Sequence, residues 1–233
     1  MVIGEWRSLV AHLLWEQRVA GSNPVSPTTA RPGGRMSKSR LELFSDGVFA
    51  IVLTLLVLNL KVPSAHGLAS LAQVAPSLLV HAATFFIVGI LWLVHHGGLA
   101  RVDKVSPRGL LINLLTLFWI TLLPFAAENS ADRPYESLGA SLMALSCGGF
   151  LLSAIATRLS MHSAIDDNPM MRRWRQNRIK VGVGIGLTDL LCAGMAWISP
   201  WIGYAAALLT VLILLLLPSP PEAEEKFRDA AAT

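Results

Sequence analysis

Residues 40–62, RLELFSDGVFAIVLTLLVLNLKV, decide the fold of this chain. The stretch opens with charged and polar residues and continues from Phe44 as an apolar run, which Lys61 and Pro63 stop. About 20 apolar residues in a helix cross a hydrocarbon layer of about 30 Å, because each residue rises about 1.5 Å. We therefore predict a transmembrane helix over residues 44–62.

Five further apolar runs follow, so we predict an all-α polytopic membrane protein with six transmembrane helices per chain, in a transmembrane domain over residues 36–217. Only 15% of the 233 residues are charged and 53% are hydrophobic, whereas soluble domains are about 25% charged. This composition makes a soluble enzyme or binding domain improbable, since so much apolar surface could not be buried. The other predicted spans are residues 76–96, 109–127, 137–157, 179–199 and 201–217.

The two ends of the chain differ from this domain. Residues 1–35 contain GSNPVSPTTARPGG, which is rich in proline, glycine, serine and threonine and is typical of disorder. The run VAGSNPVSPT is similar to an in-frame translation of a transfer-RNA gene loop, so we interpret residues 1–35 as a disordered leader or a mis-annotated start before Met36. Residues 218–233 are predicted to form a charged cytoplasmic tail.

Lysine and arginine in the predicted loops give the orientation. The loops on one side hold eleven of these residues, whereas the opposite loops hold Lys61 and Arg133. Because cytoplasmic loops carry the excess of positive charge, we predict that both termini are cytoplasmic. The eleven residues are Lys38, Arg40, Arg101, Lys104, Arg108, Arg158, Arg172, Arg173, Arg175, Arg178 and Lys180.

Polar residues inside predicted spans are costly and are therefore candidate functional residues. Asp46 lies one turn inside the first span, and Trp92, His95 and His96 share one side of the second span at the same predicted depth. Asn113 lies at a similar depth in the third span. We favour a buried structural network that joins these helices, over a metal site or an intramembrane enzyme that uses Asp46 and His95.

Asp189, midway along the fifth span, has no obvious basic partner unless His81 of the second span approaches it. It could be a protonated carboxyl or part of a proton path. The nearby GxGxG of residues 182–186 is interpreted as a close-packing helix surface, and not as a dinucleotide loop. Cys147 and Cys192 are interpreted as packing residues.

The first span carries a helical stripe of Ile51, Leu55 and Leu58, beside a second stripe of Ala50 and Thr54. Periodicity alone favours burial of this side against neighbouring helices, because every side of the helix is apolar.

Several motifs shift that interpretation. RLELFSD matches the R-x-x-x-F-S-D signature that opens the first helix of the transmembrane protein 175 family of endosomal and lysosomal potassium channels. The match continues through AIVLTLLVLNLKVP, the W-x-x-HH that ends the second span, and Asn113-Leu114 and Leu123-Pro124-Phe125 of the third. The chain therefore resembles the bacterial six-helix branch of this family over its first three spans. His81 and Thr84 depart from the family pattern, which has an aromatic residue and a serine there.

The resemblance implies a potassium-permeable homotetrameric channel in the cell membrane, with a pore lined by the first helix of each subunit. Ile51, Leu55 and Leu58 would form a hydrophobic constriction, and Thr54 would favour potassium. The network that holds the pore helix would comprise Arg40, Phe44, Ser45, Asp46, Trp92, His95, His96 and Asn113.

Selectivity is expected to be modest and voltage sensing weak, because the chain has no TVGYG filter and no arginine ladder. No cofactor, bound metal or nucleic acid is expected; the partners are further copies of the chain, membrane lipid and permeant potassium. The alternatives are a proton-coupled secondary transporter that uses Asp189 and the intramembrane enzyme named above.

Overall fold

The computed structural model describes residues 37–61, 63–64, 66–102, 104–161 and 169–217. The predictions for residues 1–35 and 218–233 lie outside these residues. The described chain is built of helices, which confirms the all-α prediction. The helices are α2 (Lys38–Leu55), the 3-10 helix η1 (Leu56–Asn59), α3 (Leu68–Leu99), α4 (Pro107–Thr121), α5 (Leu123–Asp132), α6 (Ser137–Ser160), α7 (Pro169–Met195) and α8 (Pro200–Leu216).

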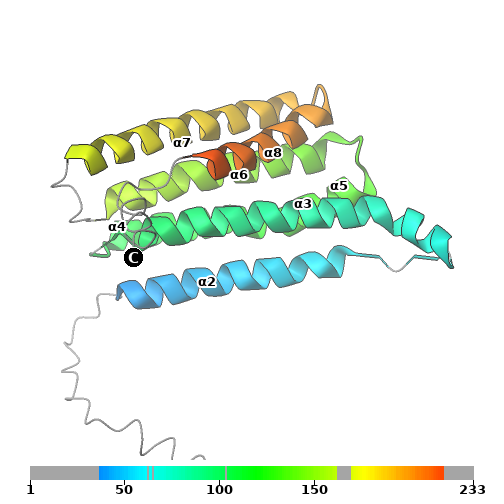
Figure 1. The fold of residues 1–233 in the computed structure, drawn as a ribbon, viewed down its shortest axis with the longest axis horizontal. Helices are drawn as coiled ribbons and strands as arrows, with labels where there is room; N and C mark the ends of the chain where they lie inside the picture. Colours follow the sequence, from blue (N-terminus) through cyan, green and yellow to red (C-terminus); the bar gives the residue numbers. More distant parts are fainter. Residues whose placement is uncertain (1–36, 62, 65, 103, 162–168, 218–233) are drawn as a thin grey trace, which may run out of the picture. The chain divides into compact units, whose positions relative to one another are not determined.

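These elements form six rods, because η1 continues α2 and α5 continues α4. The rods lie side by side in Figure 1, with α2 at one edge of the bundle and α7 at the opposite edge. Four rods are long and apolar enough to span a membrane: α2–η1, α3, α4–α5 and α6. Helix α8 is apolar but has only 17 residues, and the apolar part of α7 also carries Arg178, Lys180 and Asp189.

Helix α6 is the centre of the subunit. Of its most apolar stretch 72% is buried, against 28% for α2–η1 and 22% for α3. Small residues explain this difference, since glycine and alanine let neighbouring helices approach closely. A side chain added at Gly148 would overlap the backbone of α7, and one added at Gly149 would overlap the Trp119 ring of α4. The core of the subunit therefore lies around α6, while α2 and α3 are largely uncovered within it.

The helices differ from the predicted spans in three places, two at a helix start and one inside the third span. Helix α3 begins at Leu68 and contains Pro76, which was expected in its first turn. Figure 1 shows α3 bending near this end, as expected where proline removes a helical hydrogen bond. The third span is interrupted at Leu122, two residues before Pro124. Helix α7 begins at Pro169, so the basic segment before the fifth predicted span is helical.

The close-packing interpretation of the GxGxG segment holds for two of its three glycines. A side chain at Gly182 would meet Ile155, and one at Gly186 would meet Leu152, both on α6. Gly184 faces open space, with no atom within 4 Å of an added Cβ.

Hydrogen bonds between helix ends gather the predicted cytoplasmic loops at one end of the bundle. The Lys38 ammonium at the start of α2 donates to the carbonyl of Ala100 beyond α3 (2.6 Å). Ser106 before α4 donates to the carbonyl of Ser160 at the end of α6 (2.8 Å). We call this the basic end, because the cations counted above lie in the segments that meet there. The start of α2 and the end of α8 both lie at it, as an even number of rods requires; the side of the membrane it faces stays a prediction.

Replacing Gly203 by alanine is expected to destabilise the bundle by about 1–3 kcal/mol. A Cβ at Gly203 would overlap the backbone carbonyl of Ala140, so α8 would have to move away from α6. A drop in the unfolding temperature of the purified protein in detergent checks this. Gly184→Ala, at the glycine with open space on α7, is the matched control, and equal losses for both variants would contradict the explanation.

Candidate functional site

Helix α2 has two different faces. Ser37 caps its first turn, where its hydroxyl accepts from the backbone N–H of Arg40 (3.4 Å). The residues spaced by three or four positions along one face are buried in the subunit: Leu41, Ser45, Phe49, Val52 and, in η1, Leu56. This buried face attaches α2 to the rest of the bundle.

The opposite face of α2 contains the residues predicted to line a pore. Ile51 is 59% exposed, Leu55 43% and Leu58 74% within the single subunit. Thr54 is also exposed, and its hydroxyl donates to the carbonyl of Ile51 (2.8 Å). The hydroxyl oxygen therefore keeps acceptor capacity toward a cation. The structure thus brings all four residues to one uncovered face.

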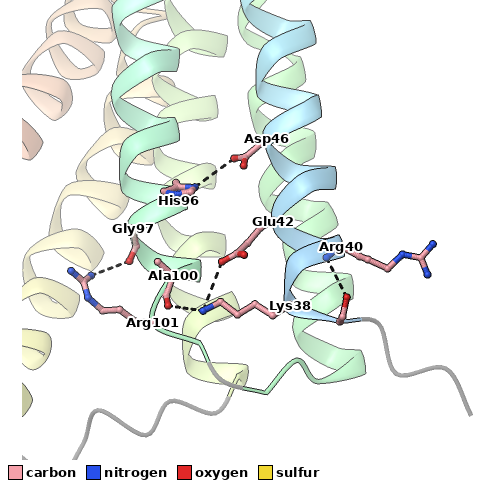
Figure 2. Close-up of polar contacts among 9 residues, drawn as sticks. Lys38, Arg40, Glu42, Asp46, His96, Gly97, Ala100 and Arg101 are labelled. Atoms are coloured by element: carbon pink, nitrogen blue, oxygen red, sulfur yellow. Dashed lines mark hydrogen bonds and ion pairs between the residues drawn. The ribbon is translucent and has the colours of Figure 1, made fainter. Parts of the chain in front are cut away.

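Asp46 joins α2 to α3 near the basic end. The indole N–H of Trp92 donates to Asp46 Oδ1 (2.8 Å), and His96 Nδ1 lies 3.7 Å from the same oxygen. Figure 2 shows Asp46 and His96 pointing toward one another from α2 and α3. The Trp92 and His96 rings also pack together, with centroids 5.4 Å apart. A carboxylate, an indole and an imidazole therefore form one polar contact between the two helices.

Ser45 and Asn113 form a second, fully buried contact between α2 and α4. The side-chain amide of Asn113 donates to the Ser45 hydroxyl (3.1 Å), and both residues are 0% exposed. A hydrogen bond between buried groups in an apolar bundle is directional, so it sets the rotation of α2 as well as its position.

His95 lies apart from these contacts. It is 2% exposed and packs against the rings of Phe49 and Phe150, with centroid distances of 5.6 and 6.1 Å. Its Nε2 atom has no hydrogen-bond partner. The neighbours His95 and His96 therefore face different surroundings, as their offset of about 100° on a helix requires.

Arg40 and Phe44 also lie outside the network predicted for them. Phe44 is 50% exposed, and Figure 2 shows the Arg40 side chain pointing away from the other labelled residues. Lys38 instead ties α2 to the end of α3, through its hydrogen bond to Ala100 and its ion pair with Glu42 (3.8 Å) (Figure 2). From the sequence, Lys38 was used only as one of the cations that predict the orientation of the chain in the membrane.

Asp189 and His81 do not meet. Both carboxylate oxygens of Asp189 accept from the Thr210 hydroxyl of α8 (2.9 and 2.8 Å), while His81 Nδ1 lies 3.2 Å from the carbonyl of Leu56. Thr210 was not singled out from the sequence, although it is the one threonine in the leucine-rich α8 and α8 has no serine.

Among the described residues, no group of three or more histidine, cysteine, aspartate or glutamate side chains could hold a metal ion. The arrangement presents an uncovered aliphatic face of α2 that carries one hydroxyl, from Thr54. Polar contacts to α3 and α4 hold this face in a fixed rotation. Such a face suits the wall of a conduction path that several subunits would enclose.

Comparison with known proteins also indicates an ion channel. The family model described as "Endosomal/lysosomal potassium channel TMEM175" matches residues 40–124. A potassium channel of Chryseobacterium sp. (strain P1-3) is 33% identical over 189 residues, which cover 78% of this chain and 94% of that protein. A crystal structure titled as a lysosomal potassium-selective channel TMEM175 homolog from Chamaesiphon minutus matches with a TM-score of 0.58 at 25% identity, over 77% of this chain and 96% of that one.

The fold and the site define a multi-pass helical membrane protein of the ion-channel class. The chain belongs to the TMEM175 family, whose members are channels and not enzymes. The match over residues 40–124 covers the first three spans, as the motifs predicted. The mouse endosomal/lysosomal proton channel TMEM175 is 33% identical over 140 residues, which cover only 28% of that longer protein.

Proposed function

We propose that this chain forms a homotetrameric, potassium-permeable channel in the cell membrane, with one α2 from each subunit around the pore. The observation that supports the proposal is the uncovered face of α2, on which Ile51, Leu55 and Leu58 are exposed while the opposite face is packed. An enzyme pocket near Asp46 would instead have buried the Ile51 face within the subunit.

The proposed constriction is a ring of four Ile51 side chains, continued by Leu55 and Leu58. An aliphatic ring too narrow for a hydrated ion closes the path by dewetting, and a small rotation of α2 would open it. The four Thr54 hydroxyl oxygens would replace part of the hydration shell of a potassium ion. The selectivity would be modest because hydroxyls on a helix form no carbonyl filter.

Ion flux into liposomes tests the function directly. We expect purified protein in potassium-loaded liposomes to release potassium faster than protein-free liposomes do, and faster than it releases sodium from sodium-loaded ones. Native mass spectrometry of the same sample should show four copies. Liposomes that stay tight to potassium, or that pass only protons as reported by a pH-sensitive dye, would contradict the proposal.

A further inference from the structure

A cavity of about 250 Å³ lies between α3, α6, α7 and α8 toward the basic end. It is lined by no residue of α2, so the proposed pore does not use it. Its lining divides into a cationic part and an aliphatic part, which together indicate the chemistry of an occupant.

Four arginines line the cationic part of the cavity: Arg101, Arg158, Arg175 and Arg178. Arg158 of α6 reaches across to α3, where its guanidinium donates to the carbonyl of Val94 (2.5 Å) and lies against Gly98. A side chain at Gly98 would overlap this guanidinium, so the absence of a side chain there leaves room for Arg158. Planar guanidinium groups gathered in this way match the oxygens of a phosphate, which accept paired hydrogen bonds.

Trp174 of α7 holds two of these cations in place. The Arg101 guanidinium lies 5.1 Å and the Arg178 guanidinium 5.5 Å from the centre of the Trp174 ring. An aromatic ring stabilises a cation over its face without neutralising the charge. The ring therefore gathers two guanidinium groups at one wall of the cavity. Tryptophan and arginine together are also typical of the level where lipid head groups lie.

The rest of the cavity is aliphatic. Leu151, Ala154 and Ile155 of α6 form one wall, and Leu214 of α8 with the adjoining Leu217 forms another. A free inorganic anion would gain nothing from these walls. An occupant with both a phosphate and a hydrocarbon chain would satisfy both parts of the lining.

We propose that this cavity binds an anionic phospholipid, whose phosphate group lies between Arg158 and Arg178. The beginning of one acyl chain would follow the leucine-lined side of α6 and α8 toward the membrane interior. The site is distinct from the proposed pore and does not depend on it.

Lipid binding to the purified full chain, measured by native mass spectrometry, tests this site. We expect phosphatidylglycerol to bind at least about tenfold more tightly than phosphatidylcholine with the same acyl chains. Arg178→Gln should remove that preference. Arg173→Gln is the matched control, because Arg173 is exposed on the same helix and does not line the cavity. Trp174→Leu removes the ring beneath two guanidinium groups, so it should also weaken the preference for phosphatidylglycerol. Arg158 is left unchanged in both variants, because replacing it would also remove its hydrogen bond to α3.

Three results would overturn the proposal. The first is equal binding of the two lipids by the unmodified protein. The second is an equal loss in Arg173→Gln and Arg178→Gln, which would indicate diffuse surface charge only. The third is binding of glycerol phosphate as tightly as phosphatidylglycerol, which would indicate a site for a free anion.

Discussion

Ile51→Asn is expected to raise the potassium leak of reconstituted liposomes about tenfold, equivalent to lowering the barrier for permeation by about 1.4 kcal/mol. In the proposed tetramer the substitution would replace four aliphatic side chains with four amides, which hydrogen-bond water at the proposed constriction. Dewetting would then no longer close the path. Ile51 is 59% exposed in the subunit, so the change leaves the packed face of α2 intact.

The matched control is Leu212→Asn. Leu212 lies on α8 and is 51% exposed, so it undergoes the same kind of change at a position remote from α2. Potassium release from vesicles loaded with each protein at equal density compares the two. An Ile51→Asn channel as tight as the unmodified one, or an equal leak from Leu212→Asn, would count against Ile51 as the constriction.

Asp46→Ala is expected to destabilise the subunit by about 1–2 kcal/mol and to lower the fraction of assembled tetramer. The substitution removes the acceptor of the Trp92 indole N–H and the carboxylate beside His96. The contact between α2 and α3 weakens, so the rotation of α2 that exposes the Ile51 face is no longer fixed. Thermal unfolding in detergent and size-exclusion chromatography of the same sample measure the two effects.

Asp46→Asn separates the hydrogen bond from the charge. The amide oxygen can still accept from Trp92, so this variant should lose less stability than Asp46→Ala. The double variant Asp46→Ala with Trp92→Phe also lacks the indole N–H, so no donor is left without its acceptor. Part of the stability lost in Asp46→Ala should therefore be recovered. A stable, fully assembled Asp46→Ala protein would show that this contact does not hold α2 in place.

The number of rods and their helical nature could be predicted from the sequence, because an apolar run of sufficient length has few stable forms in a bilayer. The residues at which the rods begin and end could not be predicted in this way. The basic segment at the start of α7 is polar and was read as a loop, yet it continues the helix. The lone Pro76 was read as a helix start, yet it lies within α3. A hydropathy pattern records where the chain is apolar, and helices extend beyond the apolar part.

The candidate site could likewise be predicted only in part from the sequence. Asp46, Trp92 and His96 were grouped by their depth and helical spacing, and they do meet. His95 was grouped with them by the same reasoning and instead packs against Phe49 and Phe150. Depth can be counted along a helix, but the neighbour that a side chain meets depends on how the helix is rotated against its partners.

The sequence by itself determined the class of protein, because burying so many apolar residues in so short a chain requires a membrane, and its opening motif pointed to the family. Only the tertiary structure decided which face of α2 is packed. Every face of that helix is apolar, so periodicity carries no information about its partners. Two polar contacts, from Ser45 to Asn113 and from Asp46 to Trp92, set its rotation. The residues that complete them come from α3 and α4, far along the chain.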